Sequence, residues 1–175
     1  TLDPERTAAT TLDYTTKEVL ALAMERGDEQ QILYGLSLLE VGRQAGWHPV
    51  LRGLLDHPSA AIRQRAVRLL GETGDREVTV RVEKMLADQS PEVRGEVLHY
   101  LVVHTGRDPI HLLSAETDLP PYALQGSVVA YLARSGLPEN ASAARLILET
   151  MLEPSEDNGA STRADEALEL RDDDD

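Results

Sequence analysis

Two stretches in the middle of the chain decide its fold. They read His57-Pro-Ser-Ala-Ala-Ile-Arg-Gln-Arg-Ala-Val-Arg-Leu-Leu70 and Ser90-Pro-Glu-Val-Arg-Gly-Glu-Val-Leu-His-Tyr-Leu101. In both, apolar residues recur every three or four positions, as they do along one face of an α-helix. A proline stands at the start of each stretch, where the first helical turn does not need its missing N–H. The two stretches therefore predict two amphipathic helices of the same design.

The same pattern occurs four times along the chain. It returns in residues 27–39 and 119–132, so that Ile32, Ile62, Val93 and Leu124 follow one another at separations of 30, 31 and 31 residues. A shorter apolar-periodic stretch precedes each copy, at residues 19–24, 50–55, 80–86 and 110–113. A glycine follows each copy where a helix is expected to end; these are Gly42, Gly74, Gly106 and Gly136. The sequence thus predicts four helical hairpins.

One helical hairpin cannot bury its own apolar stripe, but stacked hairpins share a continuous core. We therefore expect an all-α protein, a right-handed α-solenoid of about four hairpins. A further amphipathic helix at residues 141–152 is expected to cap its C-terminal end. The predicted organisation is an N-terminal leader over 1–14, a repeat domain over 15–153 and an acidic tail over 154–175.

A turn with a proline, followed by Val or Ile and then Arg early in the second helix, resembles HEAT repeats, in particular the short bacterial kind. In that family an Asp in the turn and an Arg early in the second helix form a ladder between neighbouring repeats. The matching residues here are Asp56 with Arg63, and Asp88 with Arg94. The resemblance implies a protein-binding scaffold or regulatory module that has no catalytic activity of its own.

A narrower resemblance concerns the start of the chain. Leu12-Asp13-Tyr14, the run from Gly27 to Leu36 and the following Leu38-Leu39-Glu40 look like the HEAT modules fused to bacterial ATP/ADP-carrier-like membrane proteins. This resemblance implies a cytoplasmic module within a larger bacterial protein, tethered in that case to a membrane protein.

Composition excludes several classes of function. The chain of 175 residues has no cysteine, which excludes disulfides, a thiol nucleophile and thiolate-ligated metal sites. Its net charge of −14 argues against nucleic-acid binding, which needs a basic surface. No apolar run reaches the length of a membrane span, so we expect no direct insertion into a bilayer. No motif indicates a cofactor.

The charge is concentrated in the tail. Residues 154–175 carry nine Asp or Glu against Arg163 and Arg171, and they begin with the helix-breaking run Pro154-Ser-Glu-Asp-Asn-Gly159. We expect this segment to be disordered, because apart from Ala164, Ala167, Leu168 and Leu170 it has little apolar surface to bury. The alternative is a functional tail that docks on a basic surface.

A row of side chains on the second helices is the candidate binding site. Arg65 and Arg68 lie three residues apart on one helix face, and their repeat equivalents in the third hairpin are Glu96 and His99. In HEAT stacks the second helices line the concave surface, so we expect these four residues to bind a protein or peptide. The partner would be another protein, the chain's own acidic tail or another domain of the parent chain. The alternative is a solvated face with an Arg65–Glu96 ion pair.

The sequence gives little indication of an enzymatic function. Glu96-Val-Leu-His99 has the Glu-x-x-His spacing of di-iron bundles, but those need two such motifs. HEAT-like hydroxylases rely on repeated His-Glu pairs, and no histidine here is followed by Glu. We therefore predict no catalytic and no metal-binding residues. A HEAT-architecture enzyme, lyase- or hydroxylase-like, around Glu96, His99 and His104 stays as an alternative, as does a pure spacer between domains.

Overall fold

The computed structural model describes residues 18, 22, 28–42 and 48–153. Its helices are α2 (Glu29–Gly42), α3 (His48–Gly53), α4 (Ala60–Glu72), α5 (Thr79–Lys84), α6 (Pro91–Thr105), α7 (Pro121–Arg134) and α8 (Pro138–Leu152). Three short 3-10 helices complete them: η1 (Leu54–Asp56), η2 (Met85–Ala87) and η3 (His111–Ser114). These ranges contain no strand, so the all-α prediction is confirmed. The leader over 1–14 and the acidic tail over 154–175 lie outside the described residues.

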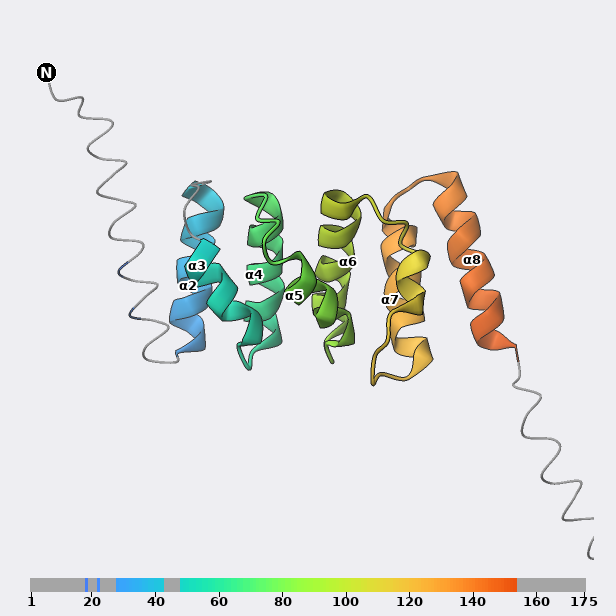
Figure 1. Cartoon of the computed structure of the whole chain (residues 1–175), viewed down its shortest axis with the longest axis horizontal. Coiled ribbons are helices and arrows are strands. Elements are labelled where there is room, and N and C mark those ends of the chain that lie inside the picture. Colours follow the sequence, from blue (N-terminus) through green and yellow to red (C-terminus); the bar gives the residue numbers. More distant parts are fainter. Residues whose placement is uncertain (1–17, 19–21, 23–27, 43–47, 154–175) are drawn as a thin grey trace, which may run out of the picture.

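The long helices form a single row in the order of the sequence. In Figure 1, α2, α4, α6, α7 and α8 stand side by side, and α3, α5 and η3 lie in front of the row. Each long helix packs on the next one, α2 on α4, α4 on α6, α6 on α7 and α7 on α8. Segments that are neighbours in the sequence are therefore neighbours in space, which is the arrangement of a solenoid of stacked hairpins.

In the second, third and fourth hairpins the first helix is shorter than the second. In the second and third hairpins it is an α-helical turn followed by a 3-10 turn, α3 with η1 and α5 with η2. In the fourth hairpin it is reduced to η3, in which only Leu112 is buried. The backbone becomes extended again at Ala115, which ends this short helical turn. The helix expected at residues 19–24 lies almost wholly outside the described residues.

Glycines end the long helices as expected. Gly74, Gly106 and Gly136 have φ angles of 73°, 67° and 69°. This left-handed conformation costs a residue with a side chain about 1 kcal/mol, whereas glycine adopts it freely. The three glycines let the chain reverse direction after α4, α6 and α7.

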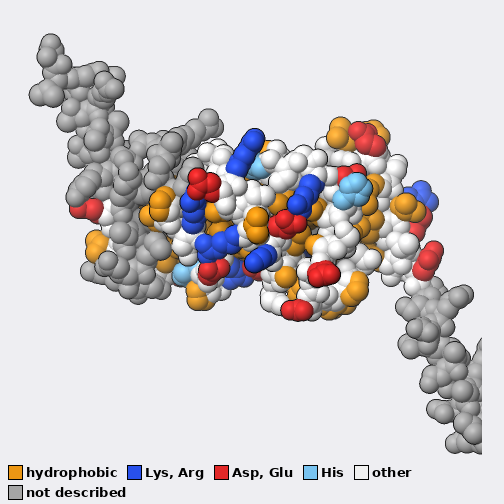
Figure 2. Space-filling view, viewed as in Figure 1, with side chains coloured by type: hydrophobic (Ala, Val, Ile, Leu, Met, Phe, Trp, Pro, Cys, Tyr) orange, Lys and Arg blue, Asp and Glu red, His pale blue; other side chains and the backbone are white. Residues whose placement is uncertain are grey.

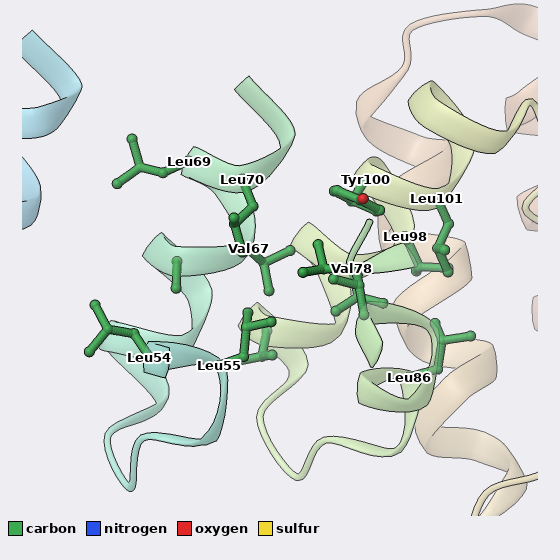
Figure 3. Packing of buried hydrophobic residues seen from close by; sticks show 14 of the residues in the cluster. Leu54, Leu55, Val67, Leu69, Leu70, Val78, Leu86, Leu98, Tyr100 and Leu101 are labelled. Atoms are coloured by element: carbon green, nitrogen blue, oxygen red, sulfur yellow. The ribbon is translucent and has the colours of Figure 1, made fainter. Parts of the chain in front are cut away.

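A continuous aliphatic core joins the hairpins. Figure 3 shows Val67 and Leu70 of α4 beside Val78 and Tyr100 of the following repeat. Leu70 and Leu98 are fully buried, and Tyr100 is the largest residue of this core. Burial of one such aliphatic side chain contributes roughly 1.5–3 kcal/mol. The seam therefore stabilises neighbouring hairpins together.

The Arg–Asp ladder of the predicted HEAT repeats is present, but among the described residues it has one rung. Arg63 donates Nε and Nη2 hydrogen bonds to the carboxylate of Asp88 in the next hairpin, both at 2.8 Å. Asp56 is not its partner and instead accepts from Arg81. Asp56 does not occupy the position in its repeat that Asp88 occupies in the next one. Asp88 precedes Val93 by five residues, whereas the residue five before the equivalent Ile62 is His57.

Arg94 takes a different partner because the fourth hairpin has no Asp at that place. Its Nε donates to Ser127 Oγ at 2.8 Å, and its Nη1 donates to the backbone carbonyl of Asp88 at 2.6 Å. Only 6% of Arg94 is exposed, so these bonds satisfy a buried cation. Both ladder arginines thus join neighbouring repeats, which agrees with the structural role expected for them.

The last helix only partly resembles a cap. α8 packs against α7 through Ala144 and Ile147, as the sequence predicts. Leu148 and Leu152 are nevertheless exposed, whereas a capping helix usually has a polar outer face.

Candidate protein-binding face

The side of the molecule that carries the short helices is rich in paired charges. Figure 2 shows basic and acidic side chains gathered together over α3 to α5. Arg52 donates to both oxygens of the buried Asp75, at 2.7 and 2.8 Å, and Arg107 donates to Glu83. These pairs bridge successive repeats. These charged side chains therefore stabilise the contacts between neighbouring repeats.

The long helices α4 and α6 line a hollow between them. The hollow has a volume of about 330 Å³. Val67, Gly71 and Tyr100 form its floor, and Arg68, Glu96 and His99 are part of its rim. Three of the four predicted binding residues therefore do lie together. We call this feature the α4–α6 hollow.

Arg65, the fourth predicted residue, does not line this hollow. Its Nη1 donates to the Leu33 carbonyl at 3.0 Å and to Ser37 Oγ at 2.8 Å, and its Nε lies 3.8 Å from Glu40 Oε1. All three partners belong to α2. Arg65 therefore holds the first long helix against the second one.

The ion pair across the hollow is formed by Arg68 and Glu96, and the Arg65–Glu96 pair considered from the sequence is wrong. Arg68 Nη2 lies 2.7 Å and its Nε 3.1 Å from Glu96 Oε1. This hydrogen bond raises the pKa of Arg68 above its usual value. Because Arg68 is already paired with Glu96, the hollow is not suited to strong binding of a partner's carboxylate. Arg68 and Glu96 instead form a polar rim.

His99 of α6 lies at the rim of the α4–α6 hollow. It is exposed, and its ring centroid lies 6.3 Å from that of Tyr131 on α7. Burial raises the pKa of Tyr131, which is half-buried. His99 and Tyr131 thus form an aromatic bridge over the joint between α6 and α7.

The second hollow lies between the start of α6 and α7, which lines it from Tyr122 to Arg134, and it was not predicted from the sequence. We call it the α6–α7 groove; its volume is about 370 Å³. Gly95, Gly126 and Ala130 line it, with Tyr122 and Tyr131 at its edge. A side chain added at Gly95 or Gly126 would meet no atom within 4 Å, so the groove is open. A signal existed in the sequence, because Gly95 and Gly126 are 31 residues apart, the repeat spacing.

The groove combines exposed aromatic surface with opposite charges at its two ends. Tyr122 is 66% exposed although it belongs to a packed helix. Glu92 lines the end where α6 and α7 begin, and Arg134 lines the end where α7 stops. Within the described part of the chain Arg134 has no ion-pair partner. The arrangement offers apolar contact along the groove and a charge at each end for orientation.

The described residues offer little for metal or membrane chemistry. No group of three or more His, Cys, Asp or Glu side chains in these ranges could hold a metal ion. In the same part of the chain, no helix combines the length and the hydropathy that a bilayer crossing requires.

The repeat geometry now has a counterpart among known families. Residues 48–130 match the family model of HEAT repeats. The match covers the second and third hairpins and most of the fourth, so it includes the α4–α6 hollow and all of the α6–α7 groove except Tyr131 and Arg134. No curated protein and no solved structure gives a significant match to the chain.

Proposed function

We propose that this chain is a non-enzymatic protein-binding scaffold or regulatory module, and that its HEAT repeats bind a protein or peptide on the exposed side of α4, α6 and α7. The α6–α7 groove carries this proposal, because it is open, lined by apolar and small residues and flanked by an exposed tyrosine. Exposed aromatic surface beside a groove is typical of protein-interaction sites.

The predicted binding row is revised in this proposal. Arg68, Glu96 and His99 form one margin of the binding face, where they give polar specificity. Arg65 is excluded, since its guanidinium group is engaged with α2. Most of the binding free energy for the partner is expected to come from contacts with Tyr122, Tyr131 and the open floor of the groove between them.

Site-specific photo-crosslinking tests the proposal. A photoreactive phenylalanine analogue replaces Tyr122 in the full chain, and a matched one replaces Arg76, which is exposed in the loop after α4. Both proteins are irradiated in an extract of the source cells. We expect a discrete protein adduct from position 122 that Gly126→Leu suppresses. Adducts of equal pattern from positions 76 and 122, or an adduct that Gly126→Leu leaves unchanged, would contradict the proposal.

We further propose that the scaffold is part of a larger, bacterial, cytoplasmic protein, which the resemblance to carrier-linked modules supports. In a chain of that kind, the binding face would contact another domain of the same polypeptide. Sequencing the gene on both sides of the segment for 1–175 tests this point directly, and flanking sequence without apolar spans would exclude the tethered version.

A further inference from the structure

We infer that the α6–α7 groove is a docking site for the chain's own segment 161–172, Ser161-Thr-Arg-Ala-Asp-Glu-Ala-Leu-Glu-Leu-Arg-Asp172. The inference deepens the proposed function and rests on it, because it names an intramolecular ligand for the same face. The segment itself lies outside the described residues, so the argument uses its sequence and the geometry of the groove.

The position of α8 brings this segment within reach of the groove. α7 and α8 are joined by the short turn at Gly136 and pack on each other along their lengths. They therefore run in opposite directions, and α8 ends at Leu152 beside the start of α7, as Figure 1 shows. Residues 154–160 can span up to about 23 Å when extended, whereas one helix is about 10 Å wide. The linker suffices to cross α7 and enter the groove at Tyr122.

The apolar residues of the segment suit a shallow groove. Ala164, Ala167 and Leu168 recur at helical spacing, so a helix would present two small side chains and one leucine on a single face. Opposite them the groove presents Gly95 and Gly126, where nothing fills the space of a side chain. Small residues against bare backbone allow two helices to approach closely, and amphipathic helices commonly bind in such grooves.

Three charged residues of the segment are opposite in sign to the charges at the two ends of the groove. Arg163 comes first in the segment, and Glu92 lies at the end of the groove nearest to the last turn of α8. The acids Glu169 and Asp172 come later, toward the end of the groove that Arg134 lines. At 1.5 Å per residue a helix covers roughly 14 Å between Arg163 and Asp172. Side-chain length covers the rest of the groove.

Covalent attachment makes a weak contact of this kind effective. A tethered segment reaches its site at an effective concentration in the millimolar range, so modest groove contacts are enough for occupancy. A docked segment would cover Tyr122 and Gly126. An external partner would then have to displace it, which would make the tail a built-in competitor.

Engineered disulfides test the docking in the full chain, which has no cysteine of its own. The test pair is Gly126→Cys with Ala167→Cys. The control pair is Ser114→Cys with Ala167→Cys, because Ser114 is exposed on the short-helix side. A third pair, Leu148→Cys with Ala167→Cys, probes the exposed face of α8. Oxidation is followed by non-reducing electrophoresis and peptide mapping at several protein concentrations.

We expect the test pair to form an intramolecular disulfide at least ten times faster than the control pair, at a rate independent of protein concentration. Equal rates for the three pairs, a faster rate at Leu148, or a disulfide only between two copies would each overturn the inference.

A charge exchange provides the second test. Glu92→Arg should slow the test disulfide severalfold, and adding Arg163→Glu should restore it; a loss without restoration counts against the proposed orientation. These readouts need no external partner. Their failure would remove the docked tail and leave the proposed scaffold function to the photo-crosslinking experiment.

Discussion

The bond between Arg63 and Asp88 shows how single residues set the contacts between repeats. A rung forms only where one hairpin supplies an Arg and the next supplies an Asp at the correct positions. Between the first and second hairpins the equivalent positions hold Leu33 and His57, so these two residues cannot form a rung. Arg63 also donates to the carbonyls of His57 and Pro58, each at 2.8 Å. The arginine thus ties the turn of its own repeat to that of the next one.

The coupling between these two residues can be measured with a double-mutant cycle. Arg63→Ala, Asp88→Ala and the double variant should give an interaction free energy of about 2 kcal/mol in urea unfolding, because the pair is bidentate and mostly buried. The exposed pair Arg145–Glu149 on α8 serves as the control and should couple by less than about 0.5 kcal/mol. Equal coupling in both cycles would show that burial does not matter here.

The same pair predicts a pH dependence of stability. Burial alone would raise the pKa of Asp88, but hydrogen bonds from Arg63 and from the Ser90 amide outweigh it and lower the pKa below the usual 3.8. The stabilisation is therefore complete above the ordinary Asp pKa and is lost as pH falls through the lowered folded-state pKa. Between pH 5 and pH 2, the free energy of unfolding should fall more steeply for the wild type than for Asp88→Ala. Parallel curves would contradict this expectation.

The absent rung can be installed. His57 Nδ1 accepts a hydrogen bond from the Ser59 amide at 3.0 Å, the role that Asp88 has toward the Ser90 amide at 2.9 Å. His57→Asp should keep that bond, and with Leu33→Arg it should create a second Arg–Asp pair. We expect the double variant to be more stable than the sum of the single variants by about 1 kcal/mol, as measured by thermal unfolding. Strict additivity would mean that the two side chains do not meet.

At the scale of elements, the glycines of this fold have two different roles. Gly136 ends α7 in a left-handed conformation, whereas Gly126 lies inside α7 and opens the α6–α7 groove. The first is required by the backbone. The second costs helix stability, because glycine inside a helix is unfavourable by roughly 0.5–1 kcal/mol relative to alanine. Retaining it leaves the groove open.

Alanine substitutions separate these two roles. Gly126→Ala should raise the free energy of unfolding by about 0.5–1 kcal/mol, since the added Cβ meets nothing within 4 Å. Gly136→Ala should lower it by about 1 kcal/mol, because its φ of 69° disfavours a side chain. Gly95→Ala is the control for α6 and should behave as Gly126→Ala does. Thermal unfolding of the three variants decides the signs.

At the scale of the whole molecule, stability follows from contacts between neighbours in the row. α4 and α6 pack on long helices on both sides, whereas the main packing of α8 among the described helices is on α7. In such stacks each repeat is stabilised mainly by its nearest neighbours. The centre should therefore open only with the whole array, and the α8 end should open locally.

Hydrogen exchange measured by mass spectrometry checks this gradient. Leu70→Ala, at a fully buried site of α4, should cost about 3 kcal/mol and reduce protection in α4 and α6 together. Ile147→Ala should reduce protection mainly in α7 and α8. Uniform loss of protection after Ile147→Ala would instead indicate one globally cooperative unit.

The candidate site was only partly predictable. Arg68, Glu96 and His99 lie together as the repeat alignment predicts, because all three face the same side of parallel helices. The partner of Glu96 was not predictable, since Arg65 and Arg68 are both long enough to reach a neighbouring helix. The α6–α7 groove was missed because small residues signal open space only when the separation of the helices is known.

The sequence by itself determined the helices, their repeat spacing and their order, because hydrophobic periodicity and helix-ending glycines act through contacts close along the chain. Only the tertiary structure decided which hairpin each arginine joins and where the surface is hollow. Those features depend on the register between helices about 31 residues apart, and a shift of one residue, as between Asp56 and His57, changes the partner.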